Sequence, residues 1–398
     1  MFARILEQRI RPIVEPTLSP QQFGFRKGKG CTDAIFALRQ ISEKTIEYKN
    51  QMNIAFIDQE KAFDRVNREI LWDVLENYGI KGTLLDCVRA IYIESESAIR
   101  TSAGLTNWFP VTSGVRQGCV LSPLLFIIYM DSITKIDDTS LDVDQQNELL
   151  FADDQCLFHN NIEQLQDHIN LLNNSCLKYN MKINIQKTEV MTISREHKDI
   201  NIQINDQTLK QVREFKYLGS IFTSDSRMDR EIETRIQQAN NITYQLTPIL
   251  KHPAIPVETK RQIINAIFIP TLCYQGQTWA LTKEQERKIT TCEMRCLRKA
   301  VNKTRRDHVR NEDIRRTVGT TPAIRFIEKQ RLKWFGHLVR MNPNTPVARA
   351  YNLKMESSRG RGRPRKRWVD GVTDILKLHN TTTYQATERA LSRKPIIS

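Results

Sequence analysis

The sequence lacks any apolar run long enough to cross a membrane. Its longest dense apolar stretch, residues 124–130, is far shorter than the roughly 20 residues that a transmembrane helix needs. Residues 1–9 carry charges at every turn, where a signal peptide would need an apolar core. We therefore expect a soluble intracellular protein, nuclear and cytoplasmic, with no membrane partner.

Cysteine pairs at metal-binding spacing are also missing. The eight cysteines are scattered and none forms a Cys-x-x-Cys pair, so neither a zinc ribbon nor a disulfide framework is indicated. Cys292 and Cys296 are four residues apart, but they continue an apolar helical stripe that includes Ile289 and Ala300. Buried small side chains are the better interpretation, because two further zinc ligands do not accompany them.

Acidic residues are scarce towards the C-terminus. The whole chain has a formal net charge of +15, and residues 301–370 alone hold 19 Lys and Arg against 6 Asp and Glu. A polyanion partner explains such an excess, because neutralising phosphates releases counterions. The alternative is a solvated basic surface that only aids solubility.

The first two hundred residues alternate short apolar runs with amphipathic stretches, which indicates an α/β or α+β region. Residues 52–58 have the pattern of a buried strand. Asn67 is placed to cap a helix over residues 68–77. Ser122, followed by proline, is placed to cap a helix over residues 124–133.

Two apolar runs flank an acidic pair at residues 149–158, which predicts a hairpin with Asp153 and Asp154 at its tip. A helical stripe covers residues 162–176, and alternation over residues 181–193 predicts a return to strands. After Gly219 the chain becomes mainly helical and increasingly basic.

Three carboxylates therefore fall at strand ends: Asp58 after the first strand, and Asp153 with Asp154 on the hairpin. Brought together, they would repel one another unless cations lay between them. Oxygen ligands with spare positions for phosphate suit Mg²⁺. Two such ions about 4 Å apart can activate an attacking hydroxyl and stabilise a leaving pyrophosphate. An acidic hairpin alone is weak support, because surface turns are often acidic.

Five segments give these carboxylates a context. They are 56–66 (FIDQEKAFDRV), 114–126 (GVRQGCVLSPLLF), 151–154 (FADD), 184–188 (NIQKT) and 217–219 (YLG). In this order they resemble motifs A to E of the reverse transcriptases of non-LTR (LINE-type) retrotransposons.

The resemblance implies an α+β right-hand polymerase. Fingers and a palm with an antiparallel sheet would occupy residues 1–222, a helical thumb residues 223–319, and a basic nucleic-acid-binding region residues 320–398. The implied activity is that of an RNA-directed DNA polymerase. It adds dNTPs to the 3′ end of a DNA primer or target on an RNA template, using two Mg²⁺ ions.

By the same resemblance, Asp58 and Asp153 bind both ions and Asp154 supports the site. Lys187 matches a lysine proposed to protonate the leaving pyrophosphate, a general-acid role; the alternative is an ordinary surface lysine. Phe63 matches the steric gate that rejects a ribonucleotide by clash with its 2′-hydroxyl; otherwise it is a core phenylalanine.

Further contacts are implied for the substrates. Gln117 and Gly118 match the segment that lines the base-pairing pocket, where glycine admits close approach and the amide offers hydrogen bonds. The segment 22–32 resembles a triphosphate-binding loop of the fingers, with Arg26 as the expected contact. Primer binding is expected at Tyr217, Leu218 and Gly219.

The tail also resembles that of animal elements of this family, through residues 331–341 and 362–368. Its Gly-Arg-Pro core predicts insertion into a narrow minor groove, and a nuclear-import signal is the alternative. The basic residues concerned are Arg361, Arg363, Arg365, Lys366 and Arg367.

An upstream fingers segment and an endonuclease domain, usual in the family, do not precede residue 1 in this sequence. A truncated, inactive copy that retains RNA or DNA binding is therefore the alternative function. An RNA-dependent RNA polymerase would share the palm, but Phe63 and the FADD segment oppose that interpretation.

Overall fold

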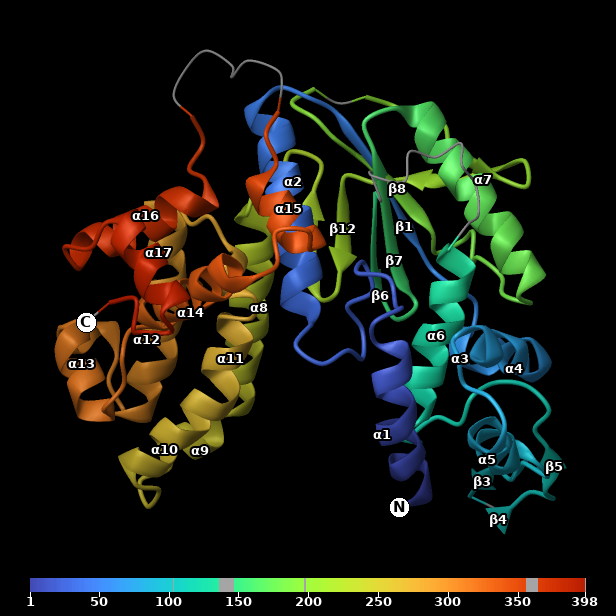
Figure 1. The fold of residues 1–398 in the computed structure, drawn as a ribbon. Coiled ribbons are helices and arrows are strands. Elements are labelled where there is room, and N and C mark those ends of the chain that lie inside the picture. Colours follow the sequence, from blue (N-terminus) through green and yellow to red (C-terminus); the bar gives the residue numbers. More distant parts are fainter. Residues whose placement is uncertain (103, 136–146, 197, 356–363, 398) are drawn as a thin grey trace. The chain divides into compact units, whose positions relative to one another are not determined.

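The computed structural model describes residues 1–102, 104–135, 147–196, 198–355 and 364–397. The chain forms two compact units (Figure 1). The first comprises Met1–Ala34 and Asn50–Leu218, and the second comprises Ile35–Lys49 and Gly219–Ser398. Helix α2 (Cys31–Glu47) begins in the first unit and passes into the second.

The first unit is built on a five-stranded sheet. Its strands, in spatial order, are β11 (Lys210–Gln211), β8 (Glu189–Ile193), β1 (Met52–Ile57), β7 (Asp154–His159) and β6 (Glu148–Phe151). All pairs are antiparallel except β11 with β8. Shorter described strands are β2 (Glu96–Ser97), β3 (Arg100–Thr101), β4 (Gly104–Leu105), β5 (Phe109–Pro110), β9 (Gln203–Ile204), β10 (Gln207–Thr208) and β12 (Glu214–Tyr217).

Helices cover this sheet and complete the core of the first unit. They are α1 (Phe2–Val14), α3 (Ala62–Arg65), α4 (Arg68–Asn77), α5 (Thr83–Tyr92), α6 (Ser122–Thr134) and α7 (Ile162–Lys178). Helix α7 packs on β1 and β7, and α6 packs between α4 and α7. Because α6 is buried on almost all sides and is mostly apolar, it is a core helix rather than an amphipathic surface helix.

The second unit is mainly helical and has its own core, which includes Phe268, Trp279 and Leu297. Its longer segment, from Gly219 onwards, begins with strand β13 (Ser220–Thr223). The helices that follow are α8 (Asp229–Gln245), α9 (Thr247–Lys251), α10 (Val257–Ile263), the π-turn η1 (Ile264–Phe268), α11 (Ile269–Leu272), the 3₁₀ turn η2 (Gly276–Thr278), α12 (Lys283–Ala300), the 3₁₀ turn η3 (Arg305–Asp307), α13 (Asn311–Val318), α14 (Ala323–Arg340), α15 (Pro346–Asn352), α16 (Trp368–Leu378) and α17 (Thr383–Leu391).

Several elements expected from the sequence are confirmed. The α+β class, the strand before Asp58, the hairpin of β6 and β7, and α7 are all present. Helix α4 has the predicted bounds, and the Asn67 side chain accepts hydrogen bonds from the backbone amides of Glu69 and Ile70.

Two local expectations are wrong. Ser122 is not an N-cap: it is the first residue of α6, and its hydroxyl lies 3.4 Å from the Tyr92 hydroxyl. Residues 181–185 form no strand, although Ile183 makes a single bridge to Gln59. There the chain follows Asp58 closely, since the amide of Asn184 donates to the Asp58 carbonyl at 2.8 Å. This contact replaces continuous pairing.

Candidate active site

Strand pairing brings the three aspartates to the same end of two neighbouring inner strands, β1 and β7. Asp58 directly follows β1, Asp154 is the first residue of β7, and Asp153 lies in the turn before it. Ile57 pairs with Gln155 in the antiparallel register. This is the last pair of the register, so Asp58 and Asp154 are the next residues beyond it at the same end of the two strands.

A segment from the N-terminal part of the chain holds the hairpin tip. The buried Gln22 side chain accepts hydrogen bonds from the amides of Ala152 at 3.1 Å and Gly24 at 2.9 Å. Phe23 donates to the Leu150 carbonyl at 2.8 Å, so this segment runs along β6. A Cβ on Gly24 would lie 2.5 Å from the Ala152 nitrogen, so this position admits only glycine without a shift of the backbone. No sequence pattern indicated that this segment fixes Asp153 and Asp154.

Burial and neighbouring carboxylates raise the pKa values of Asp153 and Asp154. Burial, followed by the neighbouring Asp153 and Asp58, raises the pKa of Asp154 to about 6. Burial also raises the pKa of Asp153, and the charge of Asp58 adds to this increase. Among the described residues, however, no three acidic, histidine or cysteine side chains gather closely enough to hold a metal ion. The three carboxylates are therefore close enough to repel one another without forming a closed cage.

The segment with Lys187 is attached to the backbone of Asp58. The Asp58 amide donates to the Thr188 hydroxyl at 3.2 Å, and the Lys187 ammonium lies 4.0 Å from an Asp58 carboxylate oxygen. The Lys187 side chain is 70% exposed, so it can reach a ligand beside Asp58. The general-acid role expected for Lys187 is compatible with this position and stays a prediction.

Phe63 is neither a fully buried core residue nor an isolated surface ring. One face stacks on the buried Phe126 at 4.1 Å between ring centroids, and Phe25 meets it edge-on at 6.4 Å. The ring remains half-buried. A half-buried ring braced from behind can act as a rigid wall, which the steric-gate hypothesis requires.

Gln117 and Gly118 lie in an exposed turn. Gln117 donates to an Asp64 carboxylate oxygen at 3.2 Å. Gly118 has φ +82°, and no atom lies within 4 Å of the place where its Cβ would be. Glycine is thus favoured here by its backbone conformation, and space in front of it is open.

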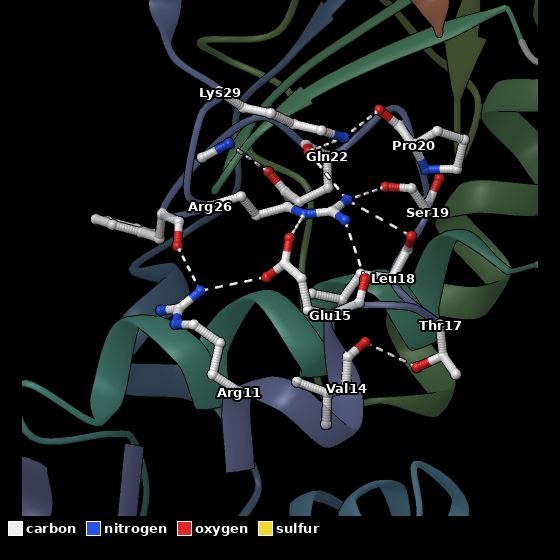
Figure 2. A network of polar contacts seen from close by, with 12 residues as sticks. Arg11, Val14, Glu15, Thr17, Leu18, Ser19, Pro20, Gln22, Arg26 and Lys29 are labelled. Atoms are coloured by element: carbon white, nitrogen blue, oxygen red, sulfur yellow. Dashed lines mark hydrogen bonds and ion pairs between the residues drawn. The ribbon is translucent and has the colours of Figure 1, made fainter. Parts of the chain in front are cut away.

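The Arg26 side chain forms its hydrogen bonds and ion pair with other residues of the protein (Figure 2). Its guanidinium binds the Glu15 carboxylate at 2.7 Å and the Ser19 carbonyl at 2.6 Å, and only 8% of the side chain is exposed. Lys29 donates to the Pro20 carbonyl at 2.8 Å, and burial lowers its pKa to about 8. The contact between Arg26 and a triphosphate stays a prediction, and it requires these bonds to be exchanged.

The residues expected at the primer are divided between the two units. In the first unit, Tyr217 is buried against Phe56, and burial followed by the charges of Cys156 and Asp154 raises its pKa well above the usual range. Leu218 and Gly219 both have positive φ, 47° and 82°, so the chain turns sharply here. Primer contact by this turn stays a prediction.

The basic residues expected near the C-terminus prove to be occupied where they are described. Arg361 and Arg363 lie outside the described residues. Arg365 donates to the Asp225 carbonyl at 2.7 Å, Lys366 pairs with Asp374 at 2.9 Å, and Arg367 pairs with Asp370 at 2.8 Å. The Asp370 carboxylate also accepts a hydrogen bond from the backbone amide of Arg367 at 2.9 Å, which caps α16.

Cys292 and Cys296 are buried on α12, as expected of small apolar side chains. Within the described part of the chain, no helix is both long and apolar enough to span a membrane.

Curated relatives of the chain come from retrotransposable elements. It is 25% identical over 270 residues to the Pol polyprotein of the type-2 retrotransposable element R2DM of Drosophila melanogaster, covering 64% of this chain and 25% of the relative. It is 27% identical to a probable RNA-directed DNA polymerase from transposon X-element of the same species, covering 71% and 32%. The polymerase from mobile element jockey of Drosophila funebris is 24% identical, covering 75% and 34%. The chain thus spans a quarter to a third of the length of these relatives.

Among solved structures, telomerase from Candida albicans with a fragment of telomeric RNA aligns at a TM-score of 0.47 and 11% identity, covering 80% of this chain and 57% of that one. The relatives among retrotransposable elements confirm the LINE-type resemblance that the motifs indicated. The model of the family described as reverse transcriptase (RNA-dependent DNA polymerase) matches residues 1–222. Because this match covers more than half of the chain, the protein belongs to the reverse transcriptase family.

Proposed function

We propose that this chain is an RNA-directed DNA polymerase that adds dNTPs to a DNA 3′ end on an RNA template. The observation that carries the proposal is that Asp58 lies near Asp153 and Asp154 at the same end of strands β1 and β7, in a member of this family. Burial and mutual repulsion there raise the pKa of Asp154 to about 6. Cations would offset the cost of holding several charged carboxylates together in a partly buried site.

The oxygen donors of the three aspartates suit two Mg²⁺ ions chemically, but to bind them the carboxylates would have to draw closer together than they lie in the structure. Carboxylate oxygens are the ligands that Mg²⁺ takes from proteins, and cations between the aspartates would offset their repulsion. Asp58 and Asp153 would hold both ions and Asp154 would support them. When bound, the ions would activate the primer hydroxyl and stabilise the charge of the leaving pyrophosphate.

The neighbouring residues supply positioning and proton transfer. Lys187, 4.0 Å from Asp58, stands where it can donate a proton to the leaving group. The braced ring of Phe63 closes the space that a 2′-hydroxyl would need. Gln117 and Gly118 leave an open, polar turn for the paired base.

A primer-extension assay tests the proposal. The purified chain, given an RNA template, a DNA primer, Mg²⁺ and dNTPs, should extend the primer, and Asp153→Asn should lower the rate at least 100-fold. Asp73→Asn, an exposed aspartate on α4, is the matched control and should extend normally. Extension with rNTPs in preference to dNTPs would contradict the choice of substrate. Absence of extension despite RNA binding would favour the inactive copy.

A further inference from the structure

The second unit contains a cationic pocket outside the residues assigned to catalysis. Its volume is about 750 Å³, and it lies beside the C-terminal half of α12 and the loop that leads to α13. No acidic side chain lines it. Six of its twelve lining residues are cationic: Lys251, Arg295, Arg298, Lys299, Lys303 and Arg305.

Three of these cations are held in place by neutral partners. Arg295 donates to the Asn240 side chain at 2.9 Å, Arg298 to that of Asn311 at 2.8 Å, and Lys299 to the Thr247 hydroxyl at 2.8 Å. Such bonds fix the position of a charge without neutralising it. The pocket is therefore organised before any ligand arrives, which lowers the entropic cost of binding.

The other three cations, Lys251, Lys303 and Arg305, are solvent-exposed. Within the described residues, none of the six pocket cations forms an ion pair. The nearby carboxylate of Asp307 is engaged otherwise: it accepts hydrogen bonds from the backbone and hydroxyl of Thr304 and caps the turn η3. The pocket thus keeps most of its positive charge.

The basic segment near the C-terminus differs in this respect. Its described members Lys366 and Arg367 each have a carboxylate partner, Asp374 and Asp370. The six pocket cations at α12 therefore lack the carboxylate partners that Lys366 and Arg367 have.

Stabilisation of α12 does not account for the pocket. Cations in a last helical turn offset the helix dipole, but that dipole corresponds to only about half an elementary charge. Arg298 and Lys299 already occupy the last turn of α12. Of the four other cations, Lys251 lies in the last turn of the short helix α9, whereas Arg295 and Lys303 lie in the last turn of no helix.

We propose that this pocket binds the phosphates of a nucleic-acid strand, at a site distinct from the three aspartates. No aromatic ring lines the pocket, so bases have no surface for stacking and recognition rests on the backbone. Binding should therefore be indifferent to sequence and strongly dependent on salt. The inference rests on the proposed function only for the choice of nucleic acid as the polyanion.

Strand binding by the full chain, measured without Mg²⁺ or dNTPs, tests this inference. Fluorescence anisotropy of a labelled 20-nucleotide RNA would be followed from low to high salt. The combined change Lys251→Gln, Lys303→Gln and Arg305→Gln should weaken binding at least tenfold at low salt. It should also reduce the slope of log affinity against log salt by roughly two, because each lost contact with a single strand contributes about 0.7.

Matched controls separate a local effect from loss of net charge. Lys81→Gln, Lys178→Gln and Lys377→Gln together remove the same charge from exposed positions elsewhere and should weaken binding less than threefold. Thr291→Glu adds a negative charge to the pocket wall, whereas Thr317→Glu adds it on α13 outside the pocket. Both threonine hydroxyls bond to a carbonyl one helical turn back, at 2.9 Å, so the two changes disturb the helices alike.

Only Thr291→Glu should weaken RNA binding. Equal effects of the two glutamates, or of the two triple changes, would overturn the inference. So would displacement of the RNA from the pocket by millimolar pyrophosphate at constant ionic strength, which would assign the pocket to a free phosphate ligand. Because no nucleotide is present, these outcomes are independent of polymerase activity. A chain that binds RNA through this pocket but fails to extend a primer would contradict the proposed function alone.

Discussion

At the scale of single residues, the acidic hairpin depends on side chains far away in the sequence. Asp58, Asp153 and Asp154 could be located from the sequence because strands and hairpins have local patterns. The role of Gln22 could not, since it holds the Ala152 amide across 130 positions by a hydrogen bond that no periodicity encodes. The sequence also did not predict the bonds of Arg26 to Glu15 and Ser19. The motif indicates that Arg26 binds a phosphate, but it does not indicate which residues Arg26 binds when no phosphate is present.

Gly24 gives a test at this scale. The change Gly24→Ala would place a Cβ 2.5 Å from the Ala152 nitrogen and 3.0 Å from the Phe151 carbonyl carbon, both backbone atoms that cannot rotate away. We expect a loss of about 1–3 kcal/mol in the free energy of unfolding, as for other overpacked sites. Primer extension should fall as well, because the displaced turn carries Asp153.

Gly30→Ala is the matched control for Gly24→Ala, and chemical denaturation would give the free energy of unfolding of both variants. Gly30 belongs to the same segment, has no positive φ, and has no atom within 4 Å of the position that an added methyl group would take. Its replacement should leave the unfolding free energy within about 0.5 kcal/mol of the original. Equal midpoints for the two variants would show that the contact with Ala152 does not constrain the hairpin.

At the scale of elements, the sequence located helices and strands better than it located their ends or partners. Ser122 has the composition of a cap, yet its hydroxyl lies against Tyr92. Alternation over residues 181–185 resembles a strand, but tertiary bonds to Asp58 take up the backbone there. In both places a contact distant in sequence decided between local alternatives that the pattern could not separate.

Helix α8 offers the test at this scale, through a buried ion pair that supports the turn after Leu218. Glu231 is fully buried, accepts a bond from the Ile221 amide at 2.6 Å, and pairs with Arg235 at 2.9 Å. Arg235 also donates to the Gly219 carbonyl and lies over the Tyr274 ring, 4.7 Å from its centroid. The pair thus connects α8 to the start of β13.

Removal of Arg235 should be costly because it leaves Glu231 charged and buried. We expect Arg235→Met to lower the unfolding free energy by about 3 kcal/mol, the usual cost of breaking a buried pair from one side. Arg230→Met on the same helix removes an exposed partner of Glu233 and should cost less than about 1 kcal/mol. Similar costs for both variants would mean that the pair with Glu231 contributes little. The Michaelis constant for the primer should rise only in Arg235→Met, if Gly219 belongs to the primer site.

At the scale of the whole molecule, the chain order and the structural units do not coincide. The sequence placed residues 1–222 together, whereas Ile35–Lys49 belongs to the same compact unit as Gly219–Ser398. Residues 34–38 of α2 (AIFAL) are an apolar run, but an apolar run does not specify which part of the chain packs against it. The partner became visible only in the structure, where Lys44 donates to the carbonyls of Ala350 and Tyr351 at 2.9 and 2.6 Å.

Replacing Phe36 should therefore affect helices that are far from it in the sequence. Its fully buried ring meets Trp368 edge-on at 4.8 Å and Trp334 at 5.5 Å, within the second unit. Phe36→Ala would leave a cavity between these rings and should cost about 3–5 kcal/mol. Hydrogen exchange should then accelerate in α14 and α16, which carry the two tryptophans, while the sheet amides of β1 and β7 keep their protection. Phe25→Ala, at a ring that is 45% exposed, should change neither. Faster hydrogen exchange in β1 and β7, with α14 and α16 unchanged, would show that Phe36 stabilises the first unit and not the second.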